Sequence, residues 1–215
     1  MHTILNFSGV YDEESWLPEG VRLIDLSPLE GTNCYCDAAA AEAVRKAIED
    51  SPAGGIHWID TGDYHYVSLF WMEKIAVPFC LALFDNHPDD QAGAFGEQIL
   101  SCGSWVKAAR GSLPLMEADY LNPADIPGSL PAYLSIDLDV LSPEFSRTDW
   151  SQGDMSPDEL LRRVEAIASG HRILGVDICG GITTAKGARP EDLAANARLR
   201  TRLYDYFSNH PPLSG

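Results

Sequence analysis

Short apolar runs alternate with amphipathic stretches along most of the chain, and this alternation restricts the fold more than any other feature. Strands are predicted at residues 2–7, 21–26, 56–60, 79–84, 133–137 and 172–178. Helices are predicted at residues 37–49, 67–74, 104–110, 156–169 and 190–207. Strands that are separated by helices usually pair in parallel, and helices then cover both faces of the sheet. The sequence therefore predicts an α/β fold of three layers, α/β/α, with a mostly parallel central sheet.

The length of 215 residues suits one compact domain with a substantial buried core. No repeat, linker or low-complexity stretch interrupts the pattern, so we predict a single domain over residues 1–215. Only the end of the chain, residues 210–215, is expected to fray, because it is rich in proline and small residues.

The charge balance limits the classes of partner. Lys and Arg number 15 against 32 Asp and Glu, which gives a net charge of −17. Nucleic acids and anionic membranes both require a positive surface, so we predict neither as a partner. The sequence has no run of 18 apolar residues, no signal-peptide pattern and an odd number of cysteines, five. We therefore expect a cytoplasmic protein with reduced thiols.

Two clusters of acidic residues follow predicted strands. Asp85, His87 and Asp89 come directly after one strand, and Asp137 and Asp139 lie at the end of another. An unpaired buried carboxylate costs several kcal/mol, whereas open α/β sheets bind ligands at the carboxyl ends of their strands. Within each cluster the alternate spacing places the side chains on one side of an extended chain. Together the clusters predict one metal site.

The donor types indicate which ions the site would hold. Carboxylate oxygens with imidazole suit Mn²⁺, with Zn²⁺, Fe²⁺ and Co²⁺ as alternatives. Four carboxylates carry more charge than one divalent ion neutralises, so two ions at a spacing of ~3.5–4 Å balance the site better. A sixth ligand should come from another strand end, and His65 is the candidate there.

Simpler interpretations exist for each part of this pattern. Asp, Asn and Pro all favour turns, so either acidic cluster alone could be a plain turn after a strand. His57 is expected in the core rather than at the metal site. The combination of both clusters with His65 is what favours metal binding over turn formation.

Three motifs resemble those of the ureohydrolase family, which contains arginases, agmatinases and formiminoglutamases. The family pattern Asp-Ala-His-x-Asp resembles residues 85–89, Ser-x-Asp-x-Asp resembles 135–139, and Gly-Gly-Asp-His resembles 62–65 with one insertion. The resemblance implies an arginase-like fold and two Mn²⁺ ions that share a bridging hydroxide. It also implies six metal ligands, namely His65, Asp85, His87, Asp89, Asp137 and Asp139.

The resemblance further implies a hydrolase in which the hydroxide attacks an electron-poor carbon and Asp89 moves a proton to the leaving amine. Two positions depart from the family pattern. Cys102 stands where relatives carry a histidine that relays protons, which makes it the second candidate catalytic residue. Gly180 stands where arginases and agmatinases carry a glutamate that binds the guanidinium, so free arginine or agmatine is not the expected substrate.

The leading prediction is a binuclear manganese hydrolase that cleaves a C–N bond in a guanidino, amidine or amide group. This chain is shorter than typical relatives, which predicts a more open cleft and a small-molecule or peptide substrate. The alternatives are a pseudoenzyme or binding module that retains the metals, and a zinc amidohydrolase of the deacetylase type. Relatives often form homo-oligomers, but the sequence does not determine the oligomeric state of this chain. Side chains expected near the mouth of the site are Cys34, Cys36, Cys102, Cys179, Trp105 and Trp150.

Overall fold

The computed structural model describes residues 1–93, 99–120, 126, 128 and 130–211, with only the backbone at 117–120. The predicted frayed tail lies outside the described residues from position 212 onward. None of the helices in the described part of the chain combines the length and apolar character that crossing a membrane requires.

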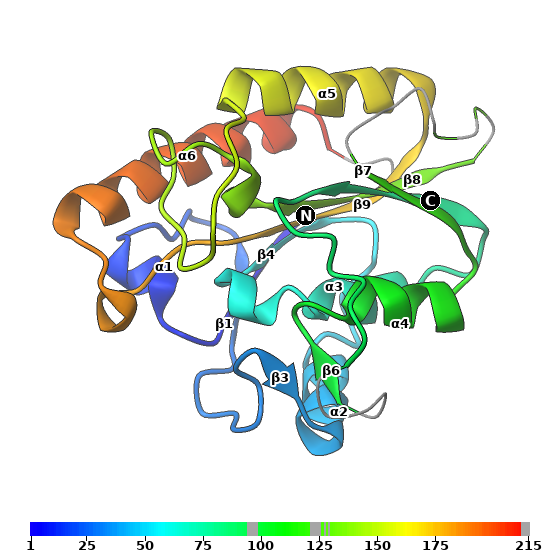
Figure 1. Cartoon of the computed structure of the whole chain (residues 1–215), viewed down its shortest axis with the longest axis horizontal. Coiled ribbons are helices and arrows are strands. Elements are labelled where there is room, and N and C mark those ends of the chain that lie inside the picture. Colours follow the sequence, from blue (N-terminus) through cyan, green and yellow to red (C-terminus); the bar gives the residue numbers. More distant parts are fainter. Residues whose placement is uncertain (94–98, 121–125, 127, 129, 212–215) are drawn as a thin grey trace.

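A seven-stranded sheet forms the middle layer, and all of its neighbouring strands run parallel. Its strand order is β2-β1-β4-β9-β8-β5-β7 (Figure 1). The strands are β1 (His2–Asn6), β2 (Arg22–Asp25), β4 (Ile56–Ile59), β5 (Phe79–Phe84), β7 (Leu115–Tyr120), β8 (Ala132–Asp137) and β9 (Ile173–Cys179). The predicted parallel sheet is confirmed.

Helices cover both faces of the sheet. On one face lie α5 (Pro157–Gly170) and α6 (Pro190–Asn209), and on the other lie α2 (Ala38–Ala47), α3 (Val67–Met72) and α4 (Trp105–Ser112) (Figure 1). A short α1 (Val10–Glu13) packs on the α5/α6 side. The predicted three-layer α/β/α architecture is thus confirmed.

The central strands bury both faces because their side chains alternate between two cores. Along β5, Cys80, Ala82 and Phe84 pack towards α5 and α6. The intervening Leu81 and Leu83 pack towards α3 and α4. Burying a leucine or phenylalanine side chain stabilises the fold by about 1.5–3 kcal/mol, so a continuous apolar run is the pattern expected of such a strand.

Strands β4, β8 and β9 also carry a buried polar network. The ring of His57 is 1% exposed and stacks on Trp71 with ring centroids 3.7 Å apart. Its Nδ1 lies 2.7 Å from Asp177 Oδ1, which also accepts a hydrogen bond from the Tyr133 hydroxyl. His57 therefore lies in the core, as predicted, rather than among the candidate ligands.

Three strands of the described chain were not predicted from the sequence, and neither was the short helix α1. The edge strand β7 was missed because Leu115–Tyr120 mixes polar and apolar residues without an apolar run. The other two, β3 (Tyr35–Cys36) and β6 (Leu100–Ser101), form a separate antiparallel ribbon. Its register places Cys34 opposite Cys102, whose backbone N–H donates to the Cys34 carbonyl oxygen over 3.0 Å.

Candidate metal centre

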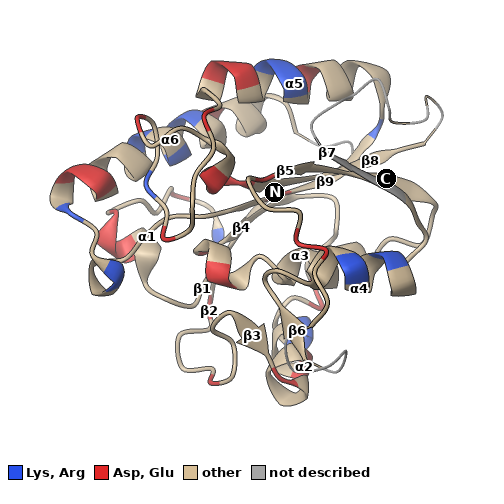
Figure 2. Cartoon of the chain, viewed as in Figure 1, with Lys and Arg blue, Asp and Glu red and all other residues tan. Residues whose placement is uncertain are grey.

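The six predicted ligands converge at the carboxyl ends of the central strands, where acidic segments gather while Lys and Arg lie mainly on helices (Figure 2). Asp85 directly follows β5, and Asp137 is the last residue of the neighbouring β8. Asp139 lies in the 3₁₀ turn Leu138–Val140, and His65 directly follows the 3₁₀ turn Gly62–Tyr64. All six except His87 are buried.

His65, Asp85, Asp89 and Asp137 form what we term the inner half of the centre. The Nδ1 atom of His65 lies 3.2 Å from Asp85 Oδ2, 3.1 Å from Asp89 Oδ2 and 3.6 Å from Asp137 Oδ2. Trp105 packs on the His65 ring and donates its indole N–H to Asp89 Oδ2 over 2.7 Å. The inner half is therefore enclosed by core side chains.

His87, Asp139 and the shared Asp85 form the outer half. The Nδ1 atom of His87 lies 2.8 Å from Asp139 Oδ2 and 3.5 Å from Asp85 Oδ1. The His87 side chain is 28% exposed, and its ring meets the edge of Trp150. Because the two oxygens of Asp85 face different halves, this carboxylate links them.

Both histidines turn Nδ1 towards the carboxylates and are held at Nε2 by a serine hydroxyl. His65 Nε2 lies 2.8 Å from Ser135 Oγ, and His87 Nε2 lies 2.8 Å from Ser151 Oγ. A hydrogen bond from Nε2 fixes the tautomer that leaves a lone pair on Nδ1. Both rings are thus oriented as metal-binding imidazoles are.

The buried polar atoms of the inner half fit a cation. Among the described residues, His65 Nδ1 and Asp85 Oδ2 are buried without a hydrogen-bond partner. Such atoms cost about 1–3 kcal/mol each when nothing satisfies them. Donor atoms that share one ion lie about 3 to 3.7 Å apart, since metal–ligand bonds measure about 2.0–2.3 Å. The observed separations of 3.1–3.6 Å fall within this range.

Burial and the crowding of negative charge raise the pKa values of two of the carboxyl groups. Burial and the charge of Asp85 raise the pKa of Asp137 to about 6. Burial and the charge of Asp137 raise the pKa of Asp139 to about 9. Burial opposes ionisation of Asp85 too, but hydrogen bonds from His65 and His87 hold its pKa below the usual range. Protons therefore occupy a site from which a divalent ion would displace them.

Two backbone positions shape the centre. Asp89 adopts a left-handed conformation, φ 48°, and its carbonyl accepts a hydrogen bond from the Val106 N–H. Gly180 has φ 105°, and a Cβ there would lie 2.8 Å from Asp137 Oδ1. Gly180 therefore has no room for a side chain beside Asp137.

A cavity of about 230 Å³ opens onto the six candidate ligands. Tyr35 and Trp150 line its edge, and each is 40% exposed, so the cavity is not sealed from solvent. Trp150 was expected there, whereas Trp105 lies behind His65 and outside the lining.

The cysteines do not gather as predicted. Cys34 and Cys102 line the cavity, but Cys36 lines a separate cavity beside α2 and α4. Cys179 is 1% exposed and lies behind the ligands, with Sγ donating to Asp137 Oδ2 over 3.0 Å. Burial raises the pKa of the Cys102 thiol, so Cys102 is protonated at neutral pH.

Three contacts of the ligands were missed from the sequence. Ser135 precedes Asp137 by two positions, and the two-residue period of a strand could have placed both on the same face. Cys179 is the register partner of Asp137 on β9, which only the pairing of the strands reveals. Ser151 lies in a loop, and no sequence pattern identifies it.

Comparison with known proteins extends these observations. No family model matches the sequence. The chain is 29% identical over 196 residues to an uncharacterized protein of Thermotoga maritima. The aligned region covers 82% of this chain and 78% of that protein.

Solved structures of ureohydrolases are similar over almost the whole chain. They include a hypothetical agmatinase from Burkholderia thailandensis, with 18% identity, a TM-score of 0.62 and coverage of 97% of this chain and 85% of that chain. The arginase from Bacillus subtilis has 12% identity and a TM-score of 0.63, and the match covers 93% of this chain and 95% of that chain. The formimidoylglutamase from Bacillus subtilis has 11% identity and a TM-score of 0.62, and the match covers 93% of this chain and 84% of that chain. This chain therefore has the fold of these ureohydrolases.

Proposed function

We propose that the protein is a hydrolase that depends on two divalent metal ions and cleaves a C–N bond in a guanidino, amidine or amide group. The observation that carries the proposal is the pair of histidine–carboxylate groups that share Asp85. The buried Nδ1 of His65 supports it, because this atom makes no hydrogen bond of good geometry and faces three carboxylate oxygens at 3.1–3.6 Å.

In this proposal the six residues predicted from the sequence hold the ions. His65, Asp89 and Asp137 belong to one ion and His87 and Asp139 to the other, with Asp85 between them. Mn²⁺ is the proposed resident ion because oxygen donors predominate. Two bound divalent ions would lower the pKa of water enough to supply hydroxide near neutral pH and would polarise the bond under attack.

The protein's own residues would then position and protonate the substrate. Burial raises the pKa of Asp89, so this carboxylate suits the role of taking a proton from the attacking water and passing it to the leaving amine. Trp105 holds Asp89 in place through the 2.7 Å hydrogen bond from its indole. Cys102, as a protonated thiol facing the cavity, is proposed to donate a proton or hydrogen bond to substrate.

The surroundings favour a substrate without a strong positive charge. Gly180 has no side chain and no space for one. Asp63, next to the cavity-lining Gly62, already accepts hydrogen bonds from Lys186 and Trp150. An uncharged amide or amidine, in a small molecule or at an accessible position of a peptide, therefore fits better than free arginine. We place this chemistry in the cytoplasm, where thiols stay reduced.

A metal-binding module without catalytic activity is the second candidate. Two observations favour it, namely Gly180 at the guanidinium position and Cys102 at the position of the histidine relay. The deacetylase type is less favoured, because it uses a single ion and the donors here form two groups linked by Asp85.

Metal analysis with a hydrolysis screen tests the proposal. Protein expressed with added Mn²⁺ is freed of loose metal, and its content is measured by plasma mass spectrometry. About two ions per chain, together with amine release from a panel of guanidino compounds, amidines, amides and peptides, is the expected result. Two ions without turnover of any substrate would favour the binding module. No bound metal in a folded protein would refute the binuclear centre.

A further inference from the structure

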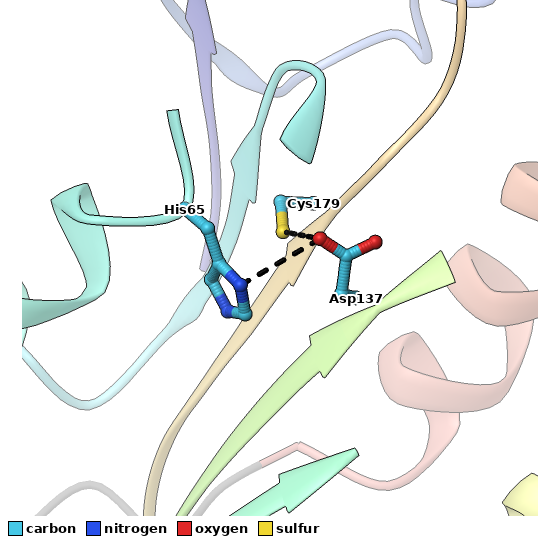
Figure 3. Close-up of side chains that lie close together, drawn as sticks. All are labelled: His65, Asp137 and Cys179. Atoms are coloured by element: carbon cyan, nitrogen blue, oxygen red, sulfur yellow. Dashed lines mark hydrogen bonds and ion pairs between the residues drawn. The ribbon is translucent and has the colours of Figure 1, made fainter. Parts of the chain in front are cut away.

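Cys179 is a buried thiol that contacts the candidate ligand Asp137 and has no role in the proposed reaction. His65, Asp137 and Cys179 together form a third group with the donor spacing of a metal site. Figure 3 shows the three side chains pointing towards one another from separate elements, namely the turn after β4 and the ends of β8 and β9. The parallel pairing of β8 with β9 places Asp137 directly beside Cys179.

We propose that Cys179 is a metal ligand of the inner half, so that this position binds a thiolate-preferring ion such as Zn²⁺, Fe²⁺ or Co²⁺ in place of Mn²⁺. This inference rests on the proposed function, because it assigns a further ligand to the same binuclear centre. Soft thiolate ligands select zinc and iron over manganese, whereas carboxylates and water suit manganese. The outer half, with oxygen donors and one imidazole, keeps its preference for Mn²⁺.

The distances between the three donors are compatible with ligation of one ion. Cys179 Sγ lies 3.0 Å from Asp137 Oδ2, and that oxygen lies 3.6 Å from the unpartnered His65 Nδ1. A thiolate sulfur at about 2.3 Å and a carboxylate oxygen at about 2.1 Å from one ion would lie about 3.1 Å apart at a right angle. One ion beside His65 Nδ1 can therefore be reached by all three donors.

The location of Cys179 leaves the substrate side of the centre open. The residue is 1% exposed and does not belong to the side chains described as lining the cavity, so it would approach the ion from the buried side. Burial raises the pKa of the free thiol, but coordination to a cation removes the thiol proton outright. Ion uptake at this position would therefore release a proton.

Cobalt serves as the probe, because its visible absorption reports binding and a near-ultraviolet charge-transfer band reports thiolate ligation. Metal-free protein is titrated with Co²⁺ under reducing, oxygen-free conditions. The wild-type protein should show both features. Cys179→Ser should keep the visible bands and lose the near-ultraviolet band. The matched control Cys36→Ser, which replaces a buried cysteine away from the ligands, should keep both.

The outcomes separate this inference from the function on which it rests. Visible bands without the thiolate band in the wild-type protein, or a thiolate band that persists in Cys179→Ser, would overturn Cys179 ligation and leave the binuclear centre intact. Absence of any bound cobalt, manganese or zinc would overturn the centre itself.

A second measurement does not depend on whether the variant folds. X-ray absorption of the zinc-loaded wild-type protein should show a sulfur scatterer at about 2.3 Å, and a shell of nitrogen and oxygen alone would refute the proposal. Where Cys179→Ser is folded, its affinity for Zn²⁺ relative to Mn²⁺ should fall on the order of 10- to 100-fold, the range seen when even an outer-shell partner is lost. An unchanged ratio would also count against ligation.

Discussion

Apart from the thiol that we propose for the inner half, the two halves of the centre use the same donor types, but they are built from different parts of the fold. His65 in the inner half is 1% exposed and is fixed by Ser135 on β8 and by Trp105 on α4. His87 in the outer half is 28% exposed and is held by Ser151, a loop residue.

This difference predicts different behaviour of the two positions. Strand and helix residues that are packed in the core hold ligands more rigidly than loop residues do. Binding at the inner position should therefore be tighter and slower to exchange, and the outer position should respond more to solvent, chelators and pH. The experiments that follow test this contrast.

Removing the carboxylate that both halves share should have the largest effect on metal content, because neither half can then hold its ion. Asp85→Ala is expected to lower the metal content from about two ions per chain to near zero, since Asp85 contributes one oxygen to each half. Plasma mass spectrometry after gel filtration measures this. Asp90→Ala, an exposed aspartate in the same segment that pairs with Arg110, is the control and should retain both ions. Two ions in Asp85→Ala would show that the site is wrongly assigned.

Replacing one histidine at a time should separate the halves. His65→Ala and His87→Ala are each expected to retain one ion per chain. In the metal-free state His65→Ala should lose about 3 kcal/mol of stability, because it leaves buried carboxylates without their partner. The partly exposed His87 should cost about 1 kcal/mol. Denaturant unfolding checks both values, and equal losses would contradict the inner–outer contrast.

The serines behind the histidines should tune affinity without abolishing it. Ser135→Ala is expected to weaken metal binding on the order of 10- to 100-fold, since it frees the tautomer and orientation of His65. Ser151→Ala should have a smaller effect, because solvent can replace its hydroxyl at the exposed His87. Competition with a chelating dye gives both affinities. A larger loss in Ser151→Ala would reverse our assignment of the more rigid half.

The smallest expected effect is a dependence of the stability of the metal-free protein on pH. It arises from two titrating residues of the outer half. Hydrogen bonding with Asp85 raises the pKa of His87 to about 9, and burial raises that of Asp139 to about 9. The proton on His87 stabilises the folded state fully below the ordinary histidine value of about 6.5, and this stabilisation is lost as pH rises towards 9. The proton on Asp139 acts in the same direction, but its contribution is lost over the wider range from the ordinary value of 3.8 up to about 9. The melting temperature of metal-free protein should therefore fall across this window, by about 2–4 °C per kcal/mol lost.

Two controls accompany the pH measurement. His87→Gln removes one of the titrating groups and should flatten the curve. Protein loaded with Mn²⁺ should show no such fall, because the ions replace the protons. A melting temperature of the metal-free protein that rises between pH 6.5 and 9 would contradict the prediction.

The sequence predicted the parts of the fold and site that depend on local pattern. The strand before Asp85 was recognised because Phe79–Phe84 is continuously apolar, as a strand buried on both faces must be. The acidic clusters were recognised because carboxylates at strand ends need a partner. Their convergence follows from the parallel pairing of β5 with β8, which the alternation of strands and helices already implied.

What escaped prediction depends on register and on loops. The contact of Cys179 with Asp137 needs the exact alignment of two strands that are 42 positions apart. Cys36 was expected at the mouth of the site because it was taken to lie in a loop or at a strand end, but it belongs to the short strand β3 and lines a different cavity. The ligand assignments themselves stay predictions until metal is measured.

Gly180 has a consequence for how the activity of this chain could change over time. With φ 105°, and with Asp137 and Leu138 within 2.9 Å of where a Cβ would lie, the position accepts no larger residue unless its neighbours move. The buried Arg200 adds to this constraint by donating a hydrogen bond to the Gly180 carbonyl over 2.6 Å. A single substitution to glutamate would therefore damage the metal centre before it could create a site for guanidinium. Any evolutionary or engineered route to arginase-like specificity has to rebuild this turn first.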